Sequence, residues 1–235
     1  MNKYAVVTGS SRGVGAALAR ALAANGYSVA VCYNTSKNLA FKVATESSSF
    51  GTLVIPVHMN VASETSVKKA FEYINACFPR IDLLINNAAT DAIRPLEDTS
   101  FSQWKKITET NLNGVFLTSR EVLPKMRETG GTIINVSSIW AQKGASCEAP
   151  YSASKAGVEG FTRSVAKEYP TVRTLAVSLG FVDTNMTAGL TEAEINAFLQ
   201  ENKEVSRRTP DEAANEILKT INDESVCSGE VVRLW

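Results

Sequence analysis

Short runs of aliphatic and β-branched residues alternate with stretches of helical periodicity along most of the chain. Runs of this length and composition are typical of parallel strands that are covered on both faces. We therefore predict seven strands, which cover residues 4–8, 28–33, 53–57, 83–85, 132–137, 174–178 and 231–234.

Between the strands, apolar residues recur with the period of an amphipathic helix. In the first such stretch they stand at positions 14, 17, 18, 21 and 22, and Gly26 follows as a helix stop. Further helices are predicted over residues 38–48, 63–77, 101–127, 151–169, 191–202 and 211–222. The repeated β-α-β order predicts one α/β domain over residues 1–235, built on a three-layer, doubly wound parallel sheet.

Composition and charge narrow the possible functions. Lys plus Arg and Asp plus Glu both number 24, so no charge bias favours nucleic acid or a membrane surface as a partner. No apolar run approaches the roughly 20 residues of a membrane span, and the N-terminus has the pattern of a strand rather than of a signal peptide. The four cysteines are scattered and His58 is the only histidine, which predicts no metal site. We expect reduced thiols and a cytoplasmic protein.

A glycine-rich loop, with Gly9, Gly13 and Gly15, joins the first predicted strand to the first helix. Glycines at such a turn let the backbone approach a pyrophosphate, whose charge the helix N-terminus stabilises. An ordinary glycine-rich turn is the alternative interpretation. The order of strand, loop and helix at the N-terminus favours a dinucleotide site of the Rossmann type.

The end of the second predicted strand indicates which dinucleotide is bound. A site for NAD usually has an acid there, but the first acid of this chain is Glu46. The charged residues among the first 45 are all cations, namely Lys3, Arg12, Arg20, Lys37 and Lys42. Lys3, Arg20 and Lys42 are expected to be solvated surface groups. The residues that we assign to the 2′-phosphate of NADPH are Arg12, Asn34, Ser36 and Lys37.

Tyr151 and Lys155 stand four residues apart at the start of a predicted helix, so their side chains share one face. A lysine cation within about 4–6 Å of a tyrosine favours the phenolate and lowers its pKa toward the working range of a proton shuttle. Such a pair alone is weak evidence. Ser138 directly follows the strand at 132–137, however, and ligands bind at the carboxyl ends of parallel strands. The three groups together predict protonation of a carbonyl oxygen, with Ser138 as the polarising donor.

These motifs resemble the short-chain dehydrogenase/reductase family and, within it, the 3-oxoacyl-[acyl-carrier-protein] reductases. The resemblance covers nearly the whole chain. The matching segments are Thr8-Gly9-x-x-x-Gly13-x-Gly15, Asn60-Val61, Asn86-Asn87-Ala88, Asn111, Ser138, Tyr151, Lys155 and Gly180-Phe181-Val182-Asp183-Thr184.

The resemblance implies a role for each of these residues. NADPH delivers hydride to the carbonyl carbon, Tyr151 protonates the oxygen and Ser138 orients it. Lys155 binds the nicotinamide ribose, and Asn111 holds a water that links Lys155 to solvent. The implied cofactor-binding residues, together with those of the second strand, are Gly9, Ser11, Arg12, Gly13, Val14, Gly15, Asn34, Thr35, Ser36, Lys37, Asn60, Val61, Asn87, Ala88, Ala89, Tyr151, Lys155, Gly180, Val182 and Thr184.

The sequence departs from the family pattern at three places. Ala89 replaces a glycine, Leu179 stands where a proline is usual before Gly180, and the chain lacks the common Gly-Gly tail. In the family that tail lies near a subunit interface, so the departure weakens the implied homo-oligomer, a tetramer or a dimer. None of the three changes removes a reactive group.

The substrate is the least defined feature. Its lining residues are expected in stretches 89–95, 139–149 and 185–203, within a lid-like segment at about 185–208. A small-molecule or acyl-carrier-protein-linked carbonyl is expected, most readily a 3-oxoacyl thioester of fatty-acid or polyketide synthesis. The alternatives are a reductase of another small ketone, sugar or steroid, and a non-catalytic NADP-binding sensor or scaffold. The apolar residues of the lid-like segment, which contact an acyl chain or serve only for packing, are Met186, Leu190, Ile195, Phe198 and Leu199.

Overall fold

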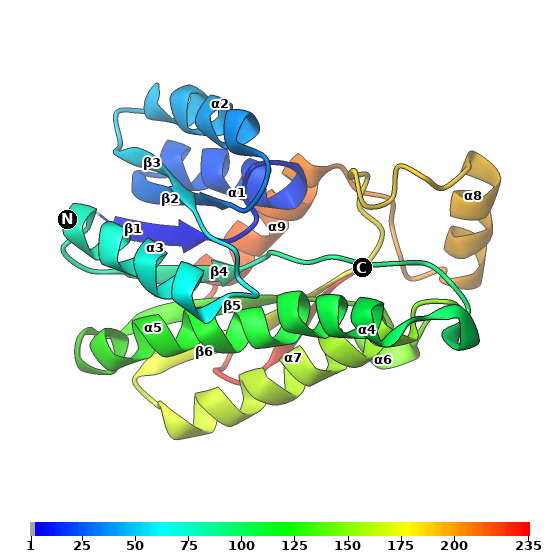
Figure 1. Cartoon of the computed structure of the whole chain (residues 1–235). Coiled ribbons are helices and arrows are strands. Elements are labelled where there is room, and N and C mark those ends of the chain that lie inside the picture. The colour runs from blue at the N-terminus through cyan, green and yellow to red at the C-terminus, as the bar shows by residue number, and fades with distance from the viewer. Residues whose placement is uncertain (1–2) are drawn as a thin grey trace.

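Seven parallel strands form one twisted sheet between two layers of helices in the computed structural model, which describes residues 3–235 (Figure 1). The strand order is β3-β2-β1-β4-β5-β6-β7, and every pair is parallel. The strands are β1 (Lys3–Val7), β2 (Tyr27–Tyr33), β3 (Val54–His58), β4 (Leu83–Asn86), β5 (Gly131–Ser138), β6 (Val172–Leu179) and β7 (Val231–Leu234). The doubly wound parallel sheet predicted from the sequence is confirmed.

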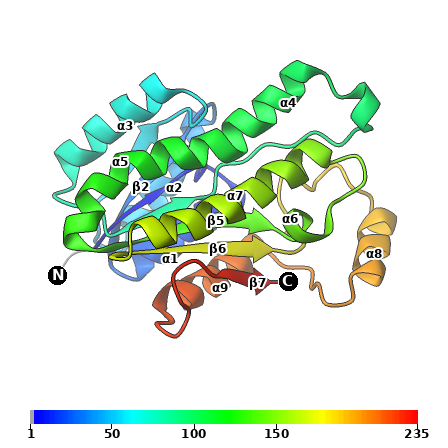
Figure 2. The same cartoon turned by 90° about the horizontal axis from the view of Figure 1, so that it is seen from below.

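The helices cover both faces of the sheet. Helices α1, α2 and α9 lie on one face, and α3, α5 and α7 lie on the other (Figures 1 and 2). Their bounds are α1 (Gly13–Ala24), α2 (Lys37–Ser48), α3 (Glu64–Cys77), α4 (Phe101–Thr108), α5 (Gly114–Thr129), α6 (Trp140–Lys143), α7 (Ala149–Glu168), α8 (Glu192–Glu201) and α9 (Pro210–Asn222), with a 3₁₀ turn at Leu96–Asp98. No helix within this described part is long and apolar enough to cross a membrane.

Alternate residues of each strand point to opposite faces of the sheet and pack in two separate hydrophobic cores. In β1, Ala5 and Val7 pack beneath α1 and α9, whereas Val6 packs on the opposite side beneath α3 and α5. All seven residues of β2 are buried. Coverage on both faces explains why these strands are nearly continuous apolar runs rather than alternating patterns.

The single helix predicted over 101–127 is wrong in one respect. A π-helical segment, Glu109–Asn113, separates α4 from α5. Asn111 lies in the middle of this segment and is 1% exposed. Its side-chain amide is satisfied by hydrogen bonds with the backbone of Thr90. Such insertions are frequent at functional sites, and this one carries a predicted catalytic residue.

The sheet has its topological switch point next to β1. The chain proceeds from β1 to β2 and β3 on one side, and β4 then continues on the other side. In parallel sheets, a crevice opens there at the carboxyl ends of the strands. The segment between β6 and α9, which includes α8, extends beyond the same ends (Figure 2). It packs through a small apolar cluster of its own, formed by Ile139, Phe181, Ile195 and Val205.

Candidate active site

A cavity of about 680 Å³ opens at the carboxyl ends of the strands. It gathers residues from all three stretches that were expected to contact the substrate and from every predicted cofactor motif. The predicted site residues that line it are Gly9, Ser11, Arg12, Gly13, Val14, Gly15, Asn34, Thr35, Ser36, Asn60, Val61, Asn87, Ala88, Ala89, Ser138, Tyr151, Lys155, Gly180, Val182 and Thr184. Lys37 and Asn111 are the two predicted site residues outside this lining.

The glycine loop forms a cradle that a side chain would fill. Gly9 and Gly13 adopt φ angles of 63° and 56°, in the left-handed region that favours glycine. A Cβ atom at Gly15 would lie 2.5 Å from the Asn87 side chain and 2.5 Å from the Gly9 carbonyl oxygen. The loop leads into the N-terminus of α1, whose first turn contains no acid. This arrangement fits a dinucleotide pyrophosphate.

Hydrogen bonds between Asn87, which follows β4, and Thr8, which follows β1, hold the glycine loop in place. The Asn87 amide donates to the carbonyl oxygens of Thr8 and Gly9, at 2.9 and 3.3 Å. The Thr8 hydroxyl accepts hydrogen bonds from the backbone N–H groups of Asn87 and Ala88, at 2.9 and 3.0 Å. The Asn-Asn-Ala motif therefore serves partly as a brace for the cradle.

The end of β2 presents polar groups without acids to the cavity. Asn34, Thr35 and Ser36 line it beside Arg12. Lys37 instead begins α2, and its ammonium lies 5.6 Å from the centroid of the Phe41 ring. Lys37 therefore lies outside the lining of the cavity in this structure, and its assignment to the 2′-phosphate stays a prediction.

Ser138, Tyr151 and Lys155 meet at the base of the cavity. The Ser138 hydroxyl donates toward the Tyr151 oxygen, and it accepts a hydrogen bond from the backbone N–H of Trp140 at 3.3 Å. The Lys155 ammonium donates to the Val136 carbonyl oxygen at 2.8 Å and lies 5.5 Å from the centroid of the Tyr151 ring. The three groups that we predicted to act together are thus adjacent.

Burial sets the protonation of this group. It raises the pKa of Tyr151 above its ordinary value, and the nearby Asp91 and Glu148 raise it further, while the hydrogen bond from Ser138 opposes the rise. This direction is opposite to the lowering that we expected from Lys155. Burial also lowers the pKa of Lys155 to about 8. Tyr151 is therefore protonated at neutral pH, which is the form that a proton donor requires.

Asn111 stands behind the cavity wall and shapes it. Its amide oxygen accepts from the Thr90 N–H at 2.8 Å, and its amide nitrogen donates to the Thr90 carbonyl at 2.9 Å and to the Ser154 hydroxyl at 3.1 Å. Thr90 itself lines the cavity. Asn111 thereby fixes the loop after β4 against the helix that carries Tyr151.

Two acids at the cavity wall, Asp91 and Glu148, lie in the stretches 89–95 and 139–149 that were expected to contact the substrate, but neither was assigned a role from the sequence. Burial together with the hydrogen bond and charge of Asp91 raises the pKa of Glu148 to about 8. Neither forms an ion pair within the described residues.

The apolar residues of the lid-like segment take part in packing and in the cavity wall. Met186, Leu190 and Phe198 line the cavity, where Ile93 and Trp140 join them. Ile195, Leu199, Leu190 and Phe198 belong to the small apolar cluster beneath α8. Packing is therefore observed for four of the five residues, and contact with an acyl chain stays a prediction for the three that line the cavity.

Known proteins share this sequence and fold. The family described as short chain dehydrogenase matches residues 3–195. A 3-oxoacyl-[acyl-carrier-protein] reductase of Aquifex aeolicus is 38% identical over 238 residues, which cover 99% of this chain and 95% of that protein. A reductase of the same description from Synechocystis is 40% identical over 84% of this chain and 81% of its own length. An alcohol dehydrogenase of Thermococcus sibiricus, solved in complex with 5-hydroxy-NADP, superposes with a TM-score of 0.88 at 26% identity and covers 100% of this chain and 96% of its own.

Proposed function

The chain belongs to the short-chain dehydrogenase family, and from this premise we propose that it uses NADPH to reduce the ketone of a 3-oxoacyl thioester. It is an oxidoreductase of CH–OH and C=O groups with a nicotinamide cofactor. The observation that carries the proposal is the meeting of Tyr151, Ser138 and Lys155 in the cavity that the glycine cradle also lines. We assign the pathway to fatty-acid synthesis, on the names of the similar reductases.

The reduction needs a hydride and a proton. The bound nicotinamide cofactor supplies the hydride to the carbonyl carbon. Tyr151 gives its hydroxyl proton to the carbonyl oxygen, while the Ser138 hydroxyl donates a hydrogen bond to that oxygen as negative charge develops on it. Lys155, with a pKa of about 8, holds a proton at neutral pH and sits next to the Tyr151 ring, from where it restores the tyrosine proton. Asn111 acts by holding Thr90 and the cavity loop, and we retain its proposed water as the path to solvent.

We propose NADPH rather than NADH as the reductant. Arg12 lines the cavity beside Asn34 and Ser36, and this end of the cavity has no carboxylate among its lining residues. A guanidinium forms charge-assisted hydrogen bonds to a phosphate, which the ribose hydroxyl of NADH cannot replace.

Steady-state kinetics with the two cofactors tests this choice. We expect kcat/KM to favour NADPH over NADH, and Arg12→Gln to reduce that preference by about tenfold or more, which is the value of one charged hydrogen bond. Lys42→Gln is the matched control, because Lys42 is an exposed cation of α2 that does not line the cavity. An unchanged cofactor preference in Arg12→Gln would contradict the assignment.

The cavity favours a neutral acyl thioester over a free 3-oxo acid. Asp91 brings negative charge close to Tyr151, whereas Glu148, whose pKa is raised to about 8, is largely protonated at neutral pH. A substrate carboxylate at that place is repelled by Asp91. The side chains of Met186, Leu190 and Phe198 offer apolar contact to an acyl chain. Carrier-protein linkage of that chain is part of the proposal.

A substrate panel tests the function directly. We expect NADPH oxidation with acetoacetyl thioester at a kcat/KM at least about tenfold above that with free acetoacetate, since one like-charge contact costs this much at a partly solvated site. Simple ketones, sugars and steroids complete the panel. Turnover of one of these alone would support the alternative reductase, whereas NADPH binding without any turnover would support the sensor.

We propose in addition a cytoplasmic homo-oligomer, either a tetramer or a dimer. Four large apolar side chains are exposed along the 3₁₀ turn, α4 and the start of α5, namely Leu96, Phe101, Trp104 and Phe116. Exposed apolar patches of this kind are typical of subunit contacts. The four cysteines are free thiols in the structure, as expected for a reducing compartment.

A further inference from the structure

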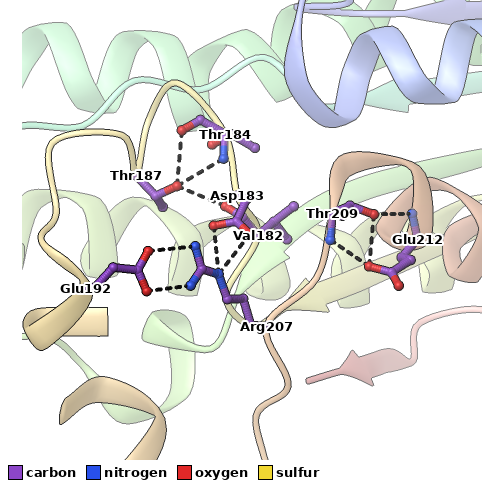
Figure 3. Close-up of polar contacts among 8 residues, drawn as sticks. All are labelled: Val182, Asp183, Thr184, Thr187, Glu192, Arg207, Thr209 and Glu212. Carbon is purple, nitrogen blue, oxygen red and sulfur yellow. Dashed lines mark hydrogen bonds and ion pairs between the residues drawn. The ribbon is translucent and has the colours of Figure 1, made fainter. Parts of the chain in front are cut away.

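One guanidinium joins three points of the chain that surround the lid-like segment. Arg207 donates through Nε to both carboxylate oxygens of Asp183, at 3.1 and 2.9 Å. Its two terminal nitrogens donate to the two oxygens of Glu192, at 2.8 and 3.1 Å (Figure 3). Asp183 follows β6, Glu192 is the first residue of α8, and Arg207 precedes α9. We call these three residues the clasp.

The clasp lies directly behind the wall of the cavity. The Asp183 N–H donates to the Arg208 carbonyl at 2.9 Å, and the Arg208 N–H donates to the Phe181 carbonyl at 3.1 Å, so the two ends of the excursion pair as a short ladder. Val182 and Thr184, on either side of Asp183, line the cavity. A movement of the clasp is therefore transmitted to the residues expected around the nicotinamide.

Further hydrogen bonds stiffen the turn that leads into the lid-like segment. The Thr187 hydroxyl accepts from the Thr184 N–H at 3.0 Å and donates to the Val182 carbonyl at 3.0 Å (Figure 3). These bonds fix the turn after Asp183 but do not reach α8. Among the described residues, Arg207 provides the ion pair between the first turn of α8 and the segment after β6.

We propose that Arg207 is a positioning residue that holds α8 and the Val182–Thr184 segment as one unit and thereby controls release of the cofactor. The inference rests on the proposed function only in assigning the cavity as the active site. The apolar cluster beneath α8 keeps the segment folded without the clasp. Loss of Arg207 is therefore expected to loosen the lid-like segment rather than to unfold the protein.

Because the clasp is exposed to solvent, its effect on cofactor release should depend on the salt concentration. The side chains of Arg207, Asp183 and Glu192 are 38%, 40% and 69% exposed. Exposed ion pairs are weakened by screening, whereas an apolar cluster is not. Salt is therefore expected to speed release more in the wild type than in Arg207→Gln, because screening of the contacts to the cofactor phosphates is common to both proteins.

The test compares Arg207→Gln with Asp183→Asn and Glu192→Gln, and uses Lys203→Gln as the control. Lys203 is an exposed cation of the same segment without an ion pair in the described structure. We expect NADPH release, followed by stopped-flow fluorescence, to be about threefold to tenfold faster in Arg207→Gln and less accelerated in each carboxylate variant. The KM for NADPH should rise while kcat is kept. When both proteins are measured without cofactor, hydrogen exchange across residues 185–205 should be faster in Arg207→Gln than in the wild type. Added salt of about 0.5 M should raise the exchange rate of the wild type close to that of Arg207→Gln.

Two results would overturn the proposal. One is an Arg207→Gln protein whose release rate and lid exchange equal those of the wild type. The other is a lower melting temperature with a fall in kcat and no local change in exchange, because the role of Arg207 would then be general stability. Release and exchange are measured without substrate. Faster release in a protein that turns over no thioester would therefore remove the proposed function and leave this inference standing.

Discussion

Replacing Tyr151 with phenylalanine is expected to lower kcat for thioester reduction by about 10²–10⁴-fold, the usual contribution of a positioned general acid. Phenylalanine keeps the ring but removes the hydroxyl that is hydrogen-bonded to Ser138. The developing oxyanion then has no proton donor beside it. The ring remains next to the Lys155 ammonium, so the cavity keeps its shape.

The measurement is NADPH oxidation under single-turnover conditions, with cofactor affinity followed separately by fluorescence titration. We expect the affinity for NADPH to stay close to that of the wild type in Tyr151→Phe, since only one hydroxyl is lost and the glycine cradle and Lys155 are unchanged. Tyr169→Phe, just beyond the other end of α7, is the matched control and should keep full activity. Normal turnover in Tyr151→Phe would refute the mechanism.

The sequence was sufficient to predict the sheet because its signal is local. The strands are buried on both faces, so mostly apolar residues follow one another, as in the fully buried β2, where Ser28 is the one small polar residue. The glycine cradle could also be predicted from the sequence, since Gly9 and Gly13 occupy backbone conformations that other residues rarely adopt. Chemistry that depends on few neighbouring residues was therefore visible before the fold.

The features that were missed depend on contacts between distant parts of the chain. Ile107 and Val115 stand eight residues apart, as two turns of an ordinary helix allow, so this spacing does not reveal the π segment. Its central residue bonds Thr90, 21 positions earlier. The contact between Asp91 and Glu148 likewise arises only when two loops meet.

The protonation of Tyr151 shows the same limit. A lysine four residues away predicts a lowered tyrosine pKa, and the spacing was interpreted correctly. Burial, Asp91 from the loop after β4 and the nearby Glu148 determine the direction instead. Sequence spacing identifies which groups meet, but only the surroundings decide which form of each group is stable.

In the glycine cradle, the substitution Gly15→Ala is expected to weaken NADPH binding by about tenfold to a hundredfold. The added methyl would lie 2.5 Å from the Asn87 side chain, 2.5 Å from the Gly9 carbonyl oxygen and 2.9 Å from the Ser10 Cα atom. No flexible group can yield, because the Asn87 amide is itself held by two carbonyls. The loop must shift, at a cost typical of overpacking, and its N–H groups lose their alignment with the pyrophosphate.

Gly160→Ala provides a precise control for this prediction, because it adds the same methyl group inside α7 with no heavy atom within 4 Å. It should bind NADPH like the wild type and gain stability, since alanine is favoured over glycine in a helix by about 1 kcal/mol. Fluorescence titration with NADPH and thermal unfolding of both variants separate loss of the site from loss of the fold. A folded Gly15→Ala protein with wild-type affinity would mean that the pyrophosphate does not lie against this loop.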